Sequence, residues 1–194
     1  MTTARGAGSA TALIAVGRCV GDLTVLASDG GQAVPDVSLE EQQMQKISTC
    51  LWFDGQAAEA AGFYTSTFDH SSMGQTMQGP DGKALTVEFE IEGRQFMGLN
   101  GGPAFSFNEA VSLVVNCDSQ EEVDKYWDAL LVGGQESQCG WLKDKFGLSW
   151  QIVPTAMNGL LAGPDPEGSQ RALEAMMKMR KLDINVLQRA YDGD

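Results

Sequence analysis

The chain has 194 residues, of which 43% are hydrophobic, so it is long and apolar enough to form a domain with a substantial core. Its net charge of −13 is spread along the chain, which predicts no nucleic-acid partner and no binding to anionic membrane surfaces. No apolar run approaches the roughly 20 residues that a membrane-spanning helix needs.

The four cysteines are far apart and form no CxxC pair; they are Cys19, Cys50, Cys117 and Cys139. Scattered cysteines of this kind are typical of reduced thiols, so we expect a cytoplasmic protein without a zinc knuckle.

The first 43 residues differ in character from the rest of the chain. They are rich in Gly, Ala, Ser and Thr and contain no aromatic residue. A short apolar run from Ala10 to Val16 is interrupted by Arg18, and no convincing cleavage pattern follows it. We interpret residues 1–43 as a disordered extension and linker, with a functional targeting signal as the alternative.

The next stretch predicts one strand, one helix and three further strands. Lys46 to Phe53 has the character of a strand, and Asp54 is the expected N-cap of a helix that ends near Phe68. The helix is expected to bury Ala57, Ala61, Tyr64 and Phe68. Three strands are then expected at 72–78, 84–92 and 95–99. Alternation within the second of these points Glu88 and Glu90 outward, and ordinary exposure explains these carboxylates better than a metal site.

The same order of elements repeats about 64 residues later, which indicates a duplicated half-domain. A strand is expected at 110–117, and Ser119 with Glu122 has the spacing of a capping box. The helix that follows should stop at Gly133-Gly134, before short strands at 135–138, 139–143 and 148–153. The last of these strands carries one central polar residue, Gln151.

The sequence therefore predicts an α+β fold: two βαβββ half-domains (44–103 and 104–163) that form a curved mixed sheet with a concave cavity, plus C-terminal helices in a tail at 164–194. Within the tail, one helix is expected after Pro164 and Pro166, and a second is capped by Asp183. We expect its Met-rich apolar stripe to pack on the same subunit or on a dimer mate.

Three segments resemble the PhnB-like branch of the vicinal oxygen chelate superfamily, which also contains glyoxalases, bleomycin-resistance proteins and extradiol dioxygenases. They are CLWFDGQAAEAAGFYTSTF at 50–68, FMGLNGGP at 96–103 and CGWLKDKFGLSWQIVP at 139–154. The resemblance covers residues 44–194. This branch is often labelled 3-demethylubiquinone-9 3-methyltransferase.

The resemblance also implies four positions at which superfamily enzymes hold a divalent metal with His and Glu side chains. Placed by motif, these positions are Thr49, Gly98, Ser112 and Gln151, none of which is His, Asp, Glu or Cys. The single histidine, His70, lies in the loop after the first helix. Because catalytic zinc or nickel needs three or four His or carboxylate ligands, we expect no metal site and no cofactor.

We therefore expect a small-molecule-binding protein without the usual divalent metal site. The resemblance implies a concave cavity lined by Thr49, Leu51, Phe53, Phe96, Ser112 and Gln151. The sequence leaves catalysis open, with catalytic residues unknown. Cys139 or Cys50 as a nucleophile, or Glu88 as a base, would serve an enzyme without a metal, such as a lyase or isomerase.

The methyltransferase activity that the family label implies is the remaining alternative. The first strand runs into Asp54-Gly55-Gln56 without the Gly-rich loop of a typical methyl-donor site. The expected partners are a small-molecule ligand and a second copy of the chain, because superfamily members commonly form homodimers.

Overall fold

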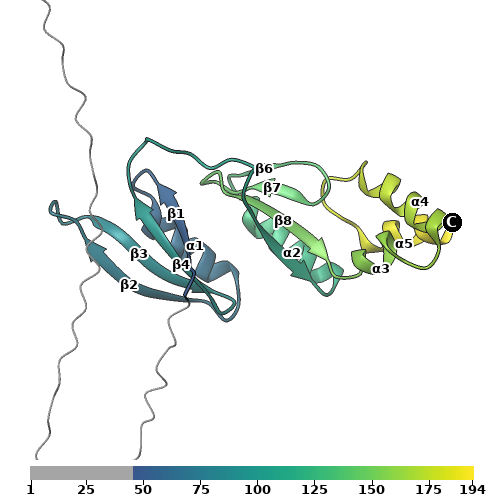
Figure 1. Ribbon diagram of the computed structural model, residues 1–194, viewed down its shortest axis with the longest axis horizontal. Helices are drawn as coiled ribbons and strands as arrows, with labels where there is room; N and C mark the ends of the chain where they lie inside the picture. Colours follow the sequence, from purple (N-terminus) through teal and green to yellow (C-terminus); the bar gives the residue numbers. More distant parts are fainter. Residues whose placement is uncertain (1–45) are drawn as a thin grey trace, which may run out of the picture. The chain divides into compact units, whose positions relative to one another are not determined.

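The computed structural model describes residues 46–194, which form an α+β fold (Figure 1). The extension predicted at residues 1–43 lies outside the described residues. Among the described helices, none has the length and apolar character needed to cross a bilayer.

The first half contains a four-stranded mixed sheet and one helix. Its elements in chain order are β1 (Thr49–Phe53), α1 (Ala57–Thr67), β2 (Ser72–Gln78), β3 (Ala84–Ile91) and β4 (Arg94–Asn100). The strand order is β1-β4-β3-β2, with β1 parallel to β4 and the other pairs antiparallel. We call this sheet A.

The second half repeats this topology, which confirms the predicted duplication. Its elements are β5 (Ser112–Cys117), α2 (Gln120–Leu130), β6 (Gln135–Glu136), β7 (Trp141–Lys143) and β8 (Ser149–Pro154). The strand order is β5-β8-β7-β6, again with one parallel pair, β5 and β8. We call this sheet B. Within residues 46–194 the two sheets are separate, whereas the sequence predicted one continuous curved sheet.

Each sheet buries the face that its helix covers (Figure 1). In sheet A the buried side chains are mainly aromatic and branched; they include Leu51, Phe53, Val87, Phe89 and Phe96. The expected helix face of Ala57, Ala61, Tyr64 and Phe68 is buried against them, as predicted. The small side chains on α1 allow a close approach, because a Cβ added to Gly98 would lie 3.0 Å from the Cβ of Ala57.

The start of α1 differs from the prediction. The N-cap residue is Gln56 rather than Asp54, and its side chain makes no capping hydrogen bond. Instead the amide of Ala57 donates to Oδ1 of Asn100 on β4 at 2.9 Å, and Nδ2 of Asn100 donates to the carbonyl of Ala84 at 2.9 Å. A residue distant in sequence thus satisfies one of the free amides that open every helix.

The start of α2 agrees with the prediction. The amide of Glu122 donates to the Ser119 hydroxyl at 3.2 Å, and the Glu122 carboxylate accepts from the amide of Asp118 at 2.7 Å. β6 and β7 are shorter than expected, since Cys139 and Gly140 adopt φ values of 57° and 83° and turn the chain between these two strands.

A buried carboxylate joins the two halves. Asp144, which is 3% exposed, precedes β8 in a turn of the second half. Its Oδ2 accepts from the Tyr64 hydroxyl of α1 and from Nε1 of Trp150, both at 2.8 Å. Its Oδ1 accepts from the amides of Phe146 and Leu148 at 2.9 and 3.1 Å. Aromatic side chains of both halves surround this group; the ring of Tyr64 lies 5.4 Å from that of Trp150.

Both pKa values at this junction are shifted upward. Burial raises the pKa of Asp144, although its four hydrogen bonds act in the opposite direction. Burial and the neighbouring Asp144 charge raise the pKa of Tyr64. All four groups around the carboxylate are donors, so they fit its ionised form and leave the Tyr64 hydroxyl protonated.

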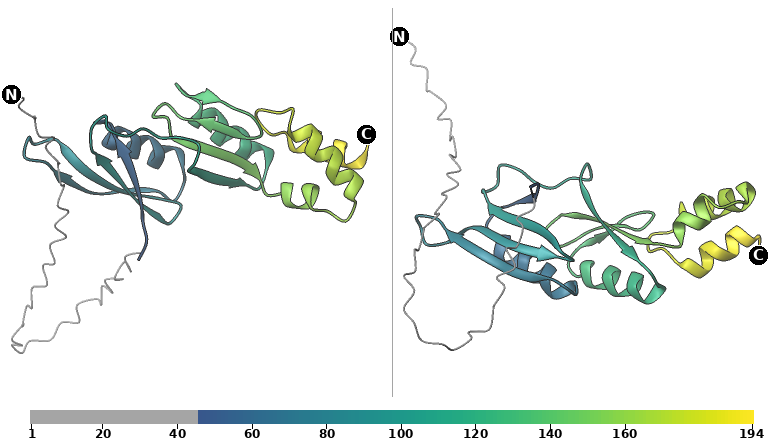
Figure 2. Two further views of the ribbon diagram at one scale, coloured as in Figure 1. Left: turned by 45° about the horizontal axis from the view of Figure 1, so that its top comes forward. Right: turned by 60° about the horizontal axis from the view of Figure 1, so that its bottom comes forward.

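Three helices that pack together follow β8 (Figure 2). They are α3 (Met157–Leu161), α4 (Pro166–Met176) and α5 (Ile184–Asp192). Asp183 caps α5 as predicted, while α3 was not expected from the sequence. A small second core holds the helices together, built from Leu160, Ala172, Leu182 and Leu187. The amide of Cys139 donates to the carbonyl of Met179 at 2.8 Å and links this core to sheet B.

Candidate functional site

Each sheet has an open face, which we define as the face opposite its helix. In sheet A, alternation along the strands places Cys50 and Trp52 of β1 on this face, because Leu51 and Phe53 point toward α1. The register then places Met97 beside Cys50 and Leu99 beside Trp52. Thr86, Glu88 and Glu90 of β3 complete the open face of sheet A.

Trp52 is held rigidly on this face by the segment after β4. Its Nε1 donates to the carbonyl of Gly102 at 2.8 Å. The indole also lies against Gly101, where an added Cβ would be 2.1 Å from a ring carbon. Only glycine therefore fits at position 101 with the indole in this orientation. Phe105 contacts the ring edge-on, with centroids 4.9 Å apart and planes at 80°.

The other end of this face is acidic. Glu88 is exposed and lies directly beside Met97 in the register between β3 and β4. Glu90 is partly buried and accepts a hydrogen bond from Nε2 of Gln95. None of the open-face positions in β1, β3 and β4 carries a Lys, Arg or His.

The open face of sheet B is mostly polar. Nε2 of Gln151 on β8 donates to the Ser112 hydroxyl on β5 at 2.8 Å. Trp141 on β7 is the register partner of Gln151, and Val114 on β5 lies on its other side and is 52% exposed. A hydroxyl, an amide and an indole therefore lie together, which suits hydrogen bonding to a small polar ligand.

Two further polar groups lie at the start of this face. The hydroxyl of Ser149 is completely buried and has no hydrogen-bond partner within the described residues. Ser149 is the register partner of Ser112 and of Lys143, and Nζ of Lys143 pairs with the Glu109 carboxylate at 2.6 Å. Lys143, the one cationic residue in strands β5 to β8, therefore already has an anionic partner.

The six residues predicted to line a ligand cavity fall into two groups. Ser112 and Gln151 lie together on the open face of sheet B, in direct contact. Leu51, Phe53 and Phe96 lie in the core between sheet A and α1, and they are between 3% and 6% exposed. Thr49 is exposed at the start of β1 and lies on the same side of the strand as Leu51.

The four positions that the motifs assign to metal ligands are divided between the two halves in a similar way. The second pair, Ser112 and Gln151, is adjacent in space, while Gly98 of the first pair faces Ala57 on the helix side. Cys50 and Met97, the neighbours of this first pair in β1 and β4, are register partners and lie on the open face instead. In the described part of the chain, no three His, Cys, Asp or Glu side chains are close enough to share a metal ion.

The predicted cysteine nucleophiles are not activated by their surroundings. Burial raises the pKa of the Cys50 thiol, so the thiolate is disfavoured. Burial, with Glu122 and Asp118 nearby, raises the pKa of Cys117 to about 12. The Cys139 sulfur contacts the Met177 sulfur of the tail at 3.7 Å. No disulfide joins these three cysteines.

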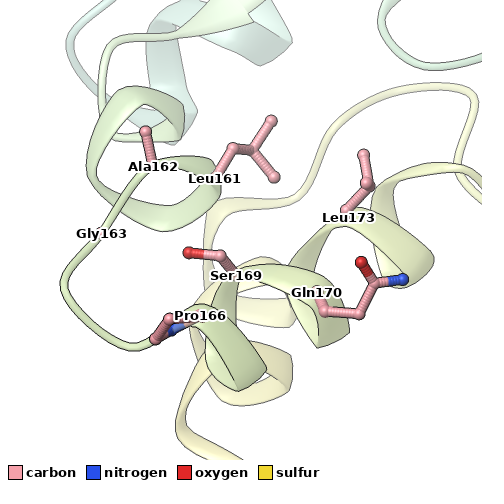
Figure 3. Close-up of a pocket in the computed structure, with 7 residues that line it drawn as sticks. All are labelled: Leu161, Ala162, Gly163, Pro166, Ser169, Gln170 and Leu173. Atoms are coloured by element: carbon pink, nitrogen blue, oxygen red, sulfur yellow. The ribbon is translucent and has the colours of Figure 1, made fainter.

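Two hollows occur elsewhere on the described chain. One, of about 680 Å³, lies beside the start of α1 and is lined in part by Asp54, Asp81 and Asn100. The other, of about 300 Å³, lies between α3 and α4, where Figure 3 shows Leu161 and Ser169 directed into the space. None of the six predicted cavity residues lines either hollow.

Sequence reasoning missed Trp52, Met97 and Trp141 as open-face residues. Alternation shows only that Trp52 lies opposite Leu51 and Phe53, and it is the burial of Leu51 and Phe53 in the structure that places Trp52 on the open face. The glycine pair at 101–102 holds the indole of Trp52.

Comparison with known proteins agrees with the fold. Residues 45–153 match the family model described as 3-demethylubiquinone-9 3-methyltransferase. No curated protein matches the chain.

Three solved structures illustrate the similarity. A PhnB protein from Bacillus cereus, named for the 3-demethylubiquinone-9 3-methyltransferase group, is 33% identical over 57% of this chain and 100% of its own, with a TM-score of 0.54. Protein PA1353 from Pseudomonas aeruginosa is 19% identical over 56% of this chain and 96% of its own, with a TM-score of 0.48. The fosfomycin resistance protein FosX from Listeria monocytogenes is 14% identical over 55% and 87%, with a TM-score of 0.42.

Proposed function

The chain belongs to the PhnB-like branch of the vicinal oxygen chelate superfamily, the 3-demethylubiquinone-9 3-methyltransferase-like family, and on this basis we propose that it binds a small molecule on the open faces of its sheets without a divalent metal. The observation that carries the proposal is the composition of those faces. The core is complete on the helix side of each sheet, so the side chains on the other side are free to contact a ligand.

The side chains on these faces are of the types that ligand sites use. Ligand pockets combine apolar and aromatic surface with a few oriented polar groups. Trp52 is already fixed by its hydrogen bond to Gly102, and Gln151 by its contact with Ser112. Groups that are rigid before binding lose little conformational entropy when a ligand arrives.

The donor set does not suit a catalytic divalent metal. The motif-based positions hold Thr49 and Gly98 in one half and Ser112 and Gln151 in the other, and the open-face neighbours of the first pair are Cys50 and Met97. Hydroxyl, amide and thioether groups bind zinc or nickel weakly in comparison with His and carboxylates, and one thiol whose pKa is raised by burial does not supply the three or four strong ligands of a catalytic site. We therefore derive no metal-dependent step for this chain.

We also propose that a second copy of the chain completes the site. β1 and β5 are edge strands of their sheets, and apolar side chains remain exposed beside them, including Ile47 (86%) and Val114 (52%). Exposed edges and apolar patches are features that an interface covers. A monomeric mass in light scattering at micromolar concentration would contradict this part of the proposal.

A thermal-shift screen of neutral, cationic and anionic compounds tests the binding function. A ligand of the proposed site raises the melting temperature of the native protein but has a smaller effect on Gln151→Ala or Trp52→Leu. Gln188→Ala, on the exposed surface of α5, is the control and should respond like the native chain. A ligand whose effect is unchanged in both site variants would place binding elsewhere.

The family description supports methyl transfer as the second candidate function. Isothermal titration with S-adenosylmethionine separates the two, because a methyltransferase must bind this donor. Micromolar binding would favour the second candidate, whereas a ligand that stabilises the protein without turnover favours the first.

A further inference from the structure

We propose that the open face of sheet A selects an apolar organic cation. This inference deepens the proposed small-molecule-binding function and rests on it. The residues that carry it are Trp52, Phe105, Met97, Leu99, Glu88 and Glu90.

The first observation is a corner made of two aromatic rings. Trp52 and Phe105 meet at 80° with centroids 4.9 Å apart, and Phe105 is 68% exposed. The Trp52 ring is fixed by the Gly102 carbonyl and by its contact with Gly101. Two rings at nearly a right angle offer both a face and an edge, which suits the aromatic or branched apolar part of a ligand.

The second observation is an apolar floor beside this corner. Leu99 is the register partner of Trp52, and Met97 follows it along β4 on the same face. Both side chains are partly exposed. The flexible thioether of Met97 adapts to ligands of different shape and contacts aromatic rings favourably.

The third observation is the sign of the charge. Glu88 is exposed next to Met97, and its side chain makes no hydrogen bond or ion pair with the described residues. Because the β1, β3 and β4 positions on this face carry no cation and the whole chain has a net charge of −13, an anionic ligand would be repelled there. A positive charge near Glu88 replaces solvent as the partner of this carboxylate.

The geometry also sets the size of the ligand. Neighbouring strands are about 4.8 Å apart, so the step from Trp52 on β1 to β3 spans about 10 Å. A ligand of that size contacts the aromatic corner and Met97 while its charge lies near Glu88. Smaller ions such as ammonium or potassium cannot use both ends.

Two probes of equal shape and opposite charge test the selection. Tetraphenylphosphonium and tetraphenylborate carry the same four phenyl groups around central atoms of opposite charge, so their apolar contacts are closely matched. Isothermal titration of the full chain should show that the cation binds at least tenfold more tightly than the anion. Equal affinities, or a preference for the borate, would overturn the inference.

Variants that each remove one carboxylate then test whether Glu88 attracts the cation. Glu88→Gln should weaken phosphonium binding about fivefold, the effect of a unit charge about 8 Å away in a half-solvated site. Glu121→Gln changes the net charge equally but lies exposed on α2, and should leave binding within twofold. Equal effects of the two variants would show that only the overall charge matters and would overturn the inference.

The outcome is separable from that of the proposed function. If a neutral compound from the thermal-shift screen stabilises the protein and neither tetraphenyl ion binds, the binding function stands and the cation selectivity is wrong. If neither the screen nor the tetraphenyl ions yield a ligand, both are wrong.

Discussion

The replacement of Tyr64 by Phe tests the junction between the two halves most directly. The Tyr64 hydroxyl is buried and donates to Asp144 at 2.8 Å, and Phe keeps the ring that packs against Trp150. A hydrogen bond to a charged acceptor contributes about 1.5–3 kcal/mol to stability. We therefore expect Tyr64→Phe to lower the free energy of unfolding by about 2 kcal/mol at pH 7.

Urea unfolding followed by circular dichroism measures this change. With a slope of about 2 kcal/mol per molar urea, the midpoint should fall by about 1 M while the slope stays constant. Tyr126→Phe is the matched control: Tyr126 is also largely buried, at 8% exposure, but its hydroxyl has no hydrogen bond among the described residues. Its effect should stay within about 0.5 kcal/mol.

The pH dependence of stability above pH 10 gives an independent test of the Tyr64 hydrogen bond. The folded pKa of Tyr64 is raised above the ordinary value of 10.0, so the unfolded chain releases this proton first. Native stability should therefore fall as the pH rises above 10, and Tyr64→Phe should remove that part of the fall. Equal losses for Tyr64→Phe and Tyr126→Phe at pH 7 would refute the reasoning about the junction.

Three further predictions concern single residues. Gly101→Ala places a Cβ 2.1 Å from the Trp52 ring, so it should lower the free energy of unfolding by about 1–3 kcal/mol and change the indole fluorescence. Gly62→Ala is the control: its Cβ meets open space, so this variant should be neutral or stabilising in the same urea titration. Asn100→Ala removes the side chain that caps α1 and should lower stability by about 1–2 kcal/mol; an unchanged urea midpoint would contradict the capping role. Burial raises the pKa of Asp144 above 3.8, so the folded state holds this proton to a higher pH than the unfolded chain does. Native stability should therefore decline as the pH rises from 3.8 through the folded pKa. Asp144→Asn should abolish this decline when urea unfolding is measured across the acid pH range.

Much of the fold was accessible from local patterns. The duplicated order of strands and helices follows from hydrophobic periodicity, and the caps at Ser119 and Asp183 follow from residues close in sequence. The cap of α1 was not accessible in this way, since its partner Asn100 lies 43 residues further along the chain. The separation of the two sheets depends on strand pairing, which local patterns do not specify.

The residues that the sequence assigns to a cavity lie in different environments. Ser112 and Gln151 are in contact on one face, and the polar Gln151 lies between the buried Trp150 and Ile152. Leu51, Phe53 and Phe96 were assigned to the cavity although they pack under α1. An error of one residue reverses every side chain of a strand, and β1 is too short for its pattern to fix the phase.

The hydrogen bonds of Asp144 make the two halves of the duplicated protein unequal. The corresponding hairpin turn of the first half holds Glu92, which is exposed and acts on the buried Tyr126 of α2 through its charge, whereas the second-half turn sends a buried carboxylate across to accept a hydrogen bond from Tyr64 of α1. The two repeats therefore have unequal roles: one supplies the acceptor and the other the tyrosine. A chain built from two copies of the first half would have the same topology twice but would lack this buried, hydrogen-bonded carboxylate.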